Sequence, residues 1–507
     1  MSILGLDVGT TGTKAVAFDI DGNIIASSYR EYPLIHPRPG WIELDSNVVW
    51  EAIKEVLTDV AGKTKHDPVR ALSISSQGEA ATPISRTGEI LDNSIVTFDI
   101  RTDGIAKWWE KVMSKEKMLK ITGMPLHGMH TISKIMWIKK NKQDIYKKTW
   151  KFLCYEDFVI YKLTGIPVID YSMAARYMAF DIKNKKWSRE ILEKAGVPEN
   201  IFPDAKPSGV IVEKINKKTA DEIGLPDDLK VVTGGHDQPC GALGAGVIKS
   251  GFVMDATGTV ECMAPAFKNP VLNKSMLKHN HCCYPHVVED LYISLSFNFT
   301  GGCLLKWYRD TFCQAEVREA KEKNKDIYDI ILGSIKDEPT NLFILPHFTA
   351  TGTPWYDTNS RGAILGLTLS TTKEEIAKAV LEGITYEMKL NLKLLEESGI
   401  EINEVRAIGG GAKSGKWLQL KSDMFGKKVV SMKVSEAGCL GAGILAGKAI
   451  GIYPSIESAV NRVVKPENTF YPDKKRKEQY EEKFNRVYKN LYPAVKDINH
   501  NISELQK

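Results

Sequence analysis

Length, composition and charge place the chain among ordinary globular proteins. Its 507 residues are 43% apolar and 26% charged, which is typical of roughly two to four domains with sizeable cores. The 68 basic and 63 acidic residues leave a formal net charge of +5. Because no long basic block dominates, composition gives no case for binding to nucleic acid or to a membrane.

Targeting and redox signals are equally plain. No apolar run approaches the roughly 18 residues that a membrane helix needs. Asp7 interrupts the apolar stretch at the start and no basic region precedes it, so no signal peptide is predicted. The eight cysteines are sparse and contain no C-x-x-C pattern. We therefore predict reduced thiols and a cytoplasmic protein.

The chain opens with a predicted β-hairpin. Residues 3–6 and 14–20 are rich in β-formers, and Asp21-Gly22 is a strong turn signal before a further short strand. A helix is predicted from Ser46, where apolar residues recur on one face, and residues 69–75 form the next strand. Strands and helices then keep alternating, which predicts an α/β fold.

A second opening strand is predicted near the middle of the chain. Residues 251–256 lead into the Gly-Thr turn at Thr259 and then into residues 260–264. This order echoes the first strand, where Asp7 precedes Gly9-Thr10. We interpret the echo as a degenerate internal repeat with its boundary near residues 247–251. A chance similarity between two short segments is the alternative.

Two further helices are predicted towards the C-terminus. Thr371-x-x-Glu374 has the pattern of a capping box. The charge run at residues 474–477 is interpreted as the solvated start of the last helix. One face of that helix carries the apolar residues Tyr480, Phe484, Val487, Tyr488 and Leu491.

The strongest chemical motif lies at residues 7–14. Its glycines let the backbone turn tightly and aim amide N–H groups at an anion. Thr10 and Thr11 add hydroxyl donors, and Lys14 adds a positive charge. Asp7, at the end of the strand, can hold Mg²⁺ through waters because hard cations prefer oxygen ligands. The motif predicts phosphate binding, with an ordinary hairpin turn as the alternative.

A second glycine-rich turn is predicted at residues 409–412, between a strand and a helix that starts near Lys416. Such a turn suits the close approach of a nucleotide. Residues 410–416 nearly match a P-loop, but Trp417 stands where Ser or Thr would bind Mg²⁺, so a P-loop NTPase is not favoured.

Three other patterns have both a structural and a functional interpretation. Gly441-x-Gly443-x-x-Ala446 resembles a dinucleotide fingerprint, although close helix packing by small residues is favoured. Asp237 follows an apolar strand, and a carboxylate placed there can act as a general base or belong to a structural turn. Residues 279–283 contain two His and two Cys at a spacing that fits no common metal site.

Taken together, the motifs carry a family resemblance. Over nearly its whole length the chain resembles the FGGY carbohydrate kinases. Residues 129–141 are similar to the first signature of that family, and residues 362–382 are similar to the second, in the right order. Supporting segments occur at residues 39–43, 163–165 and 436–442.

The resemblance implies a fold and an activity. The fold would be the α/β, two-domain, actin-like (ribonuclease H-like) sugar kinase fold, a tandem duplication around a central cleft. Residues 1–247 would mainly bind the sugar, and residues 248–507 would mainly bind ATP. The activity would be ATP-dependent phosphorylation of a hydroxyl on a small sugar or polyol, with Mg²⁺ as the second cofactor.

Site residues follow from the resemblance motif by motif. Asp237 would be the catalytic base and Asp7 would serve Mg²⁺. The substrate would contact Gln77, Glu79, Asp237 and Gln238. The residues that would bind ATP are Thr10, Thr11, Lys14, Thr259, Gly302, Gly411 and Ala412.

The sequence gives mixed signals about the substrate. Gln77-Gly78-Glu79 lies at the family's substrate loop, where glycerol kinases show Gln-Arg-Glu and xylulose kinases show Gln-Met-His. Met129 stands where glycerol kinases carry Tyr, whereas Asp237-Gln238 matches the glycerol kinase pair. Because Gly78 makes room and removes a donor, we predict a larger substrate such as a ketopentose of the xylulose type. Glycerol or another short polyol is the alternative.

Partners and rival classes complete the sequence-based picture. The predicted partner is a small-molecule sugar or polyol, with no nucleic acid and no membrane, and homodimerisation is left open. An actin-like nucleotide-dependent assembly protein could share the fold without a sugar pocket. A dinucleotide-dependent oxidoreductase would depend on the Gly441 fingerprint alone.

Overall fold

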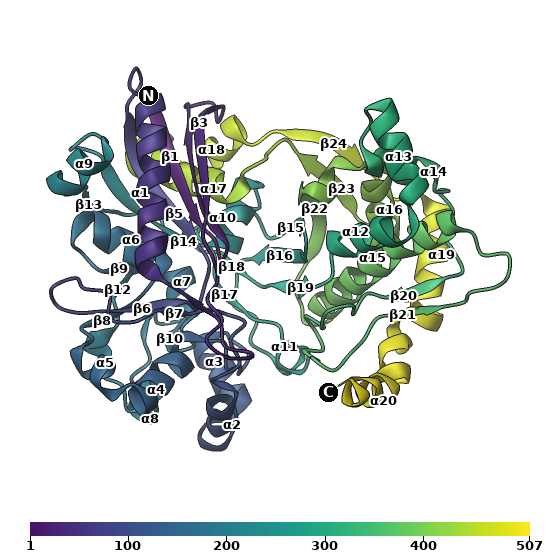
Figure 1. Ribbon diagram of the computed structural model, residues 1–507, viewed down its shortest axis with the longest axis horizontal. Helices are drawn as coiled ribbons and strands as arrows, with labels where there is room; N and C mark the ends of the chain where they lie inside the picture. The colour runs from purple at the N-terminus through teal and green to yellow at the C-terminus, as the bar shows by residue number, and fades with distance from the viewer. Residues whose placement is uncertain (507) are drawn as a thin grey trace.

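The computed structural model describes residues 1–506 and consists of two lobes, each built on a mixed β-sheet (Figure 1). The first sheet has the order β13-β14-β5-β1-β2-β3. Its strands are β1 (Ser2–Val8), β2 (Gly12–Phe18), β3 (Ile24–Glu31), β5 (Val69–Ser76), β13 (Ile211–Lys214) and β14 (Lys230–His236).

The second sheet has the order β17-β18-β16-β15-β22-β23-β24, and β19 also pairs with β16. Its strands are β15 (Gly251–Thr257), β16 (Glu261–Phe267), β17 (Tyr284–Pro285), β18 (Tyr292–Ile293), β19 (Ser296–Asn298), β22 (Ile402–Gly409), β23 (Lys428–Met432) and β24 (Pro466–Phe470).

The two sheets share one strand pattern, which confirms the internal repeat predicted from the sequence. In the first sheet β1 pairs antiparallel with β2, and β1, β5 and β14 run parallel. In the second sheet β15 pairs antiparallel with β16, and β15, β22 and β23 run parallel. In both, therefore, a hairpin strand leads a parallel series, and the connections between the parallel strands include helices.

Helices cover both sheets. Those of the first half are α1 (Ser46–Lys63), α2 (Asp103–Val112), α3 (Lys115–Thr122), α4 (Thr131–Asn141), α5 (Gln143–Lys148), α6 (Tyr155–Thr164), α7 (Tyr171–Ala175), α8 (Arg189–Ala195), α9 (Lys217–Ile223) and α10 (Asp237–Gly244). Those of the second half are α11 (Lys274–Lys278), α12 (Gly302–Phe312), α13 (Gln314–Lys323), α14 (Ile327–Ser334), α15 (Lys373–Glu397), α16 (Gly415–Phe425), α17 (Ala437–Ala449), α18 (Ile456–Val463), α19 (Lys474–Lys483) and α20 (Lys489–Leu505).

Short strands and turns complete the two lobes. In the first half these strands are β4 (Glu43–Leu44), β6 (Ala81–Ile84), β7 (Ser94–Ile95), β8 (Lys151–Cys154), β9 (Val168–Asp170), β10 (Phe180–Asp181), β11 (Lys186–Trp187) and β12 (Asp204–Lys206). In the second half they are β20 (Phe343–Leu345) and β21 (Ala363–Leu365).

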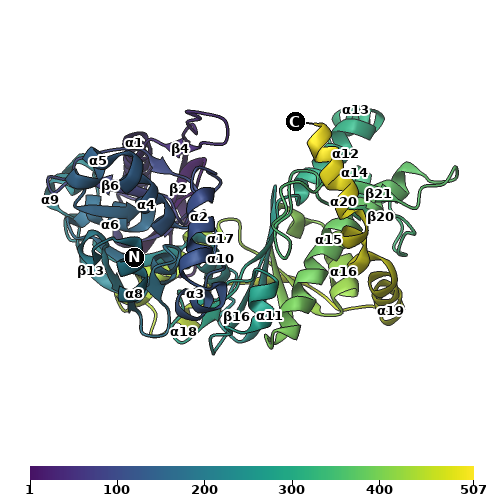
Figure 2. The same ribbon diagram turned by 90° about the horizontal axis from the view of Figure 1, so that it is seen from below.

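One helix of the second half belongs spatially to the first lobe. α17 packs on β1, β5 and β14, on the face opposite α1, and it also packs along α10 (Figure 1). Close approach explains the small residues of α17: a Cβ added to Gly441 would lie 1.9 Å from the Cys240 carbonyl oxygen. The packing of α10 with β15 and β16 joins the lobes at their base (Figure 2). The exact division at residue 247 stays a prediction.

Two predicted details are wrong at the level of single residues. The capping box of α15 is formed by Thr372 and Glu375, one position later than predicted, because the Thr371 hydroxyl instead accepts a hydrogen bond from the Thr368 N–H. The last predicted helix face is interrupted by a π-helical turn between α19 and α20, which leaves Val487 38% exposed.

Other sequence-based predictions are confirmed. The opening hairpin, the helix that begins at Ser46, the strand at residues 69–76 and the helix start at Lys474 all occur as predicted. Among residues 1–506, no helix is both long and apolar enough to cross a bilayer.

Candidate active site

The turn between β1 and β2 is closed by its own backbone and by Gln77. Gly9 N–H donates to the Gly12 carbonyl at 2.9 Å. The Thr10 hydroxyl donates to Gln77 Oε1 at 3.0 Å, and Gln77 Nε2 donates to the Gly9 carbonyl at 2.9 Å. Gln77, predicted to contact the substrate, therefore supports the turn with both ends of its amide. Thr11 stands exposed at the tip of the turn.

Two charged residues of this hairpin face α17. Asp7 accepts a hydrogen bond from the Ser75 hydroxyl at 2.5 Å, and Lys14 Nζ lies 2.8 Å from Glu436 Oε1. Burial and the nearby Glu436 charge raise the pKa of Asp7, although the Ser75 bond opposes them. Partial burial, the largest single influence, lowers the pKa of Lys14, but the bond to Glu436 and the negative charges nearby together outweigh it and leave the pKa raised. A cation near Asp7 would therefore find a poorly compensated carboxylate.

Asp237 is the first residue of α10 and follows directly on β14. The side chain is 35% exposed, but its Oδ1 atom is buried and accepts no hydrogen bond within residues 1–506. Burial, followed by the charges of Asp7 and Glu79, raises the pKa of Asp237 to about 7. A carboxyl with such a pKa is partly ionised near neutral pH, and its ionised form can take up the proton of an alcohol.

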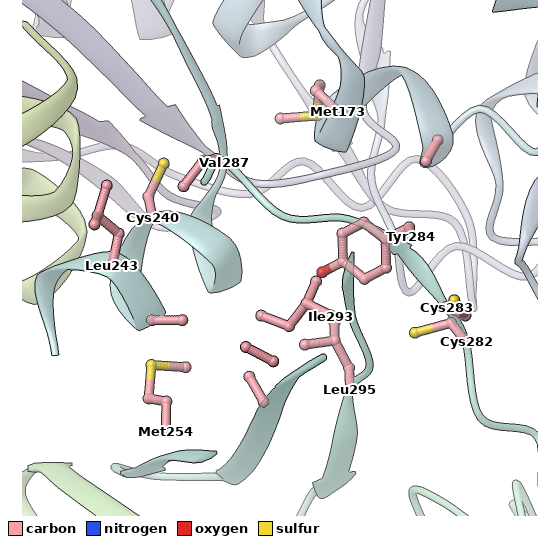
Figure 3. Packing of buried hydrophobic residues seen from close by; sticks show 14 of the residues in the cluster. Met173, Cys240, Leu243, Met254, Cys282, Cys283, Tyr284, Val287, Ile293 and Leu295 are labelled. Atoms are coloured by element: carbon pink, nitrogen blue, oxygen red, sulfur yellow. The ribbon is translucent and has the colours of Figure 1, made fainter. Parts of the chain in front are cut away.

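His236 and Tyr284 form the wall beside Asp237. His236 Nε2 lies 3.3 Å from Asp237 Oδ1, and its Nδ1 lies 3.0 Å from the Tyr284 hydroxyl. Burial and the neighbouring Arg176 lower the pKa of His236 to about 3, so the imidazole is neutral at neutral pH. Figure 3 shows Tyr284 in the buried cluster that also holds Leu243 of α10. This core fixes the wall from behind.

A buried ion pair lies on the sugar side of the predicted site. Glu79 Oε1 is paired with the Arg176 guanidinium, and the two side chains are 2% and 7% exposed. The Glu79 backbone carbonyl accepts hydrogen bonds from the Thr131 hydroxyl at 3.1 Å and from Lys134 Nζ at 3.0 Å. Glu79 also has a positive φ of 65°, a region that non-glycine residues seldom occupy. The ion pair and the two hydrogen bonds therefore hold Glu79 in this unusual backbone conformation.

Gly78 does not leave the open space that the sequence suggests. A Cβ at this position would lie 3.0 Å from His236 Cδ2 and 3.2 Å from Arg176 Cγ. The Arg176 side chain thus passes close to the point where glycerol kinases were expected to carry an arginine in the loop itself. Since Glu79 already pairs with the Arg176 guanidinium, this group is partly neutralised.

The second Gly-Thr turn opens onto a cavity of about 550 Å³ in the other lobe. Thr259, Gly302 and Gly411 line it, as three of the predicted ATP residues. Ala412 does not line it and packs on the core instead. The remaining lining includes Thr257, Gly258, Lys306, Asp326, Tyr328, Asp329, Gly410, Lys413, Ser414 and Trp417.

A buried lysine supports this second turn from beneath. Lys421 Nζ on α16 donates to Asp255 Oδ2 at 2.6 Å, Thr257 Oγ1 at 2.7 Å and Glu261 Oε1 at 2.9 Å. All three acceptors belong to β15 and β16, the strands that the turn joins. All three N–H donors of the Lys421 ammonium therefore bond to one hairpin, and they fix the geometry of that hairpin.

A smaller cavity of about 260 Å³ is lined by residues of both halves of the chain. Asp237 and Gln238 line it from α10, Thr257 and Gly258 line it from β15 and its turn, and Gly438 lines it from α17. The structure therefore brings the predicted base next to the second Gly-Thr turn. Gln238 has an unpartnered buried Oε1 atom within residues 1–506.

The remaining motifs of the sequence analysis have structural roles. Gly441 and Gly443 lie inside α17 and not at a strand-to-helix turn, so the dinucleotide fingerprint is absent. His281 Nε2 lies 3.2 Å from Asn391 Oδ1, and no cluster in residues 1–506 groups three His, Cys, Asp or Glu side chains as a metal site would. The strand-to-helix turn predicted at residues 409–412 is confirmed, with a 3₁₀ turn at Gly410–Lys413 before α16.

Sequence reasoning missed Arg176 and Lys421. Both are charged residues buried in otherwise ordinary helical or turn segments, so nothing in the local pattern distinguishes them from solvent-exposed cations. Only a contact between distant segments, Glu79 with Arg176 and Lys421 with Asp255, identifies them.

Comparison with known proteins agrees with this geometry. The model of the FGGY family of carbohydrate kinases, N-terminal domain, matches residues 2–244, and that of the C-terminal domain matches residues 256–450. The chain belongs to the FGGY family of carbohydrate kinases and is an ATP-dependent phosphotransferase acting on a sugar or polyol.

Relatives and solved structures extend over the full length. A xylulose kinase of Staphylococcus epidermidis is 29% identical over 498 residues, covering 98% of this chain and 97% of that protein. A glycerol kinase of Saccharolobus islandicus is 30% identical over 503 residues, covering 97% and 96%. The ligand-bound xylulose kinase structure from Lactobacillus acidophilus matches with a TM-score of 0.89 at 27% identity, covering 97% of this chain and 98% of that one. The predicted actin-like sugar kinase fold is confirmed.

Proposed function

We propose that the protein phosphorylates a ketopentose of the xylulose type, with Asp237 as the base and ATP held between the two Gly-Thr turns. One observation carries the assignment of roles. The Asp237 carboxyl has an unpartnered oxygen, a pKa raised to about 7 and a place on the cavity that reaches the Thr257-Gly258 turn. A base so placed can meet a substrate hydroxyl on one side and a terminal phosphate on the other.

The proposed reaction is an in-line phosphoryl transfer. Asp237 accepts the proton of the attacking hydroxyl as the new P–O bond forms and the bond to the leaving ADP oxygen breaks. His236, neutral and 3.3 Å away, lies beside the carboxyl and adds no positive charge to it. Backbone N–H groups of both turns and the Thr259 hydroxyl would bear the phosphate charge, while the Thr10 hydroxyl, bonded to Gln77, supports the first turn. Catalysis then consists mainly of positioning and electrostatic stabilisation.

Mg²⁺ would complete the phosphate site. The buried Asp7 carboxyl, whose pKa burial and Glu436 raise, fits a hard cation bound through water. The ion would supply charge neutralisation for the transferring phosphate. Lys14 lies on the same wall, with its positive charge partly neutralised by Glu436.

The substrate assignment depends on the sugar side of the site. Met129 replaces the Tyr that glycerol kinases carry, so a three-carbon substrate would lose one hydrogen-bond partner. Arg176 partly replaces the missing loop guanidinium, yet it is paired with Glu79 and less available to a triol. A longer polyol can reach both Glu79 and Gln238 with different hydroxyls. The similarity to xylulose kinases supports this choice, and glycerol is the second candidate because Gln238 matches the glycerol kinase pair.

A coupled ADP-release assay against ketopentoses, glycerol, other polyols and sugar acids tests the proposal. We expect the best ketopentose to exceed glycerol in kcat/KM by about 10- to 100-fold, the usual gain from one well-made hydrogen bond to a hydroxyl. The Asp237→Asn variant is the control for contaminating kinases. If glycerol has the highest kcat/KM of the panel, the ketopentose assignment is wrong and the Asp237-Gln238 pair is the better guide.

A further inference from the structure

A loop of the second lobe crosses to the sugar side of the first. Residues 346–362 join β20 to β21, and Tyr356 within them lies next to His127, with ring centroids 5.7 Å apart. His127 precedes α4 of the first lobe, a few residues before Thr131, which bonds the Glu79 carbonyl. The contact therefore joins the two lobes beside the predicted substrate residues, although the sequence places Tyr356 in the half expected to bind ATP.

The loop holds Tyr356 in a fixed and unusual conformation. Tyr356 has a positive φ of 49°, a region that bulky residues seldom adopt. Its N–H donates to the Gly352 carbonyl at 2.9 Å, and Thr353 N–H donates to the Phe297 carbonyl at 3.0 Å. The Tyr356 ring also packs edge-on to Phe297 at 5.6 Å. Strain of this kind persists only where the surroundings impose it, and it gathers at functional sites.

The C-terminal helix anchors the next residue of the loop. Asp357 Oδ2 accepts a hydrogen bond from the Tyr492 hydroxyl at 2.8 Å and lies 2.7 Å from His500 Nε2. Asn499 Nδ2 on the same helix donates to the Arg361 carbonyl at 2.9 Å. Figure 1 shows α20 beside β20 and β21. The loop is thus held on its outer side by α20 and presents Tyr356 towards the first lobe.

The Tyr356 hydroxyl is the unused group of this arrangement. It makes no hydrogen bond to any group of residues 1–506, while Arg176 and Glu79 are near enough to affect its pKa. Burial raises that pKa, so the phenol remains protonated and can donate a hydrogen bond. His127 is neutral as well, because burial lowers its pKa, and its Nδ1 accepts from the Met129 N–H at 3.1 Å.

We propose that Tyr356 closes the sugar site from the second lobe and that its hydroxyl binds a substrate hydroxyl other than the reacting one. The proposal rests on the assigned sugar kinase function and makes Tyr356 a specificity-determining residue. The reacting hydroxyl must meet Asp237 and the phosphate, which leaves a distal hydroxyl of a longer substrate for Tyr356. We expect a three-carbon polyol to meet only one of the two groups, so that Tyr356 would favour the longer polyol.

Tyr356→Phe tests the proposal because it removes the hydroxyl and retains the ring. Calorimetric titration with the best ketose, without ATP, and steady-state kinetics with glycerol and that ketose are the measurements. We expect Kd and KM for the ketose to rise about 3- to 10-fold, as loss of one neutral hydrogen bond predicts. We expect kcat and the KM for ATP to stay within about twofold, and the glycerol kcat/KM to be unchanged. Tyr471→Phe, on a tyrosine that is 66% exposed, is the matched control.

The anchor gives a second, independent variant. Removing the α20 bond with His500→Ala should raise the ketose KM in the same direction with little effect on kcat, since the loop is loosened and the base is untouched. Thermal unfolding of each variant identifies any loss of folded protein. Unchanged ketose Kd and KM in Tyr356→Phe, with an active wild type, would overturn the role of Tyr356. A wild type that turns over no polyhydroxylated substrate would instead overturn the proposed function itself.

Discussion

At the scale of single residues, Asp237 combines a raised pKa with an unpartnered oxygen. Asp237→Asn removes the proton acceptor while keeping the shape of the side chain. We expect kcat to fall by about 10²- to 10⁴-fold, the usual contribution of general acid–base catalysis, with the affinity for ATP nearly unchanged. Steady-state kinetics and an ATP titration check this result. A variant with near-wild-type turnover would remove Asp237 from the role of base.

The pH dependence of the reaction follows from the same carboxyl. Only the ionised form of Asp237 can accept a proton, so kcat/KM should rise with pH and level off above the pKa of about 7. Below that pH the rate should fall about tenfold per unit, because a single proton blocks the base. A pH–rate profile between 5 and 9 measures the midpoint. A midpoint near 4, typical of an ordinary aspartate, would show that burial does not control this group.

At the scale of secondary-structure elements, the close contact of α10 with α17 holds this helix of the second half against the first lobe. A Cβ at Gly441 would meet the Cys240 carbonyl oxygen at 1.9 Å, and backbone cannot yield as a side chain can. Gly441→Ala should therefore lower the free energy of unfolding by about 1–3 kcal/mol or more, the usual cost of overpacking. Urea unfolding followed by circular dichroism is the measurement.

A second glycine offers the matched control for this prediction. Gly62 lies within α1 and has nothing within 4 Å of an added Cβ. Gly62→Ala should leave stability unchanged or raise it by about 0.5–1 kcal/mol, since alanine is the better helix former. Equal effects of the two substitutions would mean that the α10–α17 contact is looser than its geometry indicates.

At the scale of the whole molecule, the two Gly-Thr turns belong to different lobes and would act on one nucleotide. Thr10 is bonded to Gln77 on the first lobe, and Thr259 lines the large cavity of the second. Thr10→Val and Thr259→Val should each raise the KM for ATP or lower kcat, with sugar binding little changed. Thr259→Val loses a hydroxyl donor to phosphate, and Thr10→Val loses the bond to Gln77 that supports the phosphate-facing turn. Kinetics over a range of ATP concentrations measure both.

The Thr259→Val variant tests whether both Gly-Thr turns contact the ATP phosphates or only the turn of the first lobe does. Wild-type behaviour of Thr259→Val at every ATP concentration would mean that the second turn shapes the cavity without contacting the phosphates. Thr11→Val is the comparison on the first lobe, since Thr11 is also predicted to bind ATP but is exposed at the tip of its turn and is not bonded to Gln77. If it behaves as Thr10→Val does, the hydroxyl bonded to Gln77 has no special role.

The sequence by itself determined the features that short stretches of chain encode. The opening hairpin, the helix at Ser46 and the glycine-rich turn after β22 follow from turn chemistry and apolar periodicity, which are local. The family signatures added the duplicated fold, and the structure reproduces it as two sheets with the same strand pattern. Asp237 was placed correctly at the end of a strand because a strand's end is visible in the sequence.

Only the tertiary structure decided which distant groups meet. Arg176 lies against Glu79 at the space beside Gly78, Lys421 ties Thr257 to its neighbours, and Tyr356 crosses from one lobe to the other. Each of these depends on burial, which sets the cost of leaving a charge or donor unpaired, and burial is a property of the packed chain. The sequence lists the charged and aromatic residues, whereas packing decides which of them form the walls of the site.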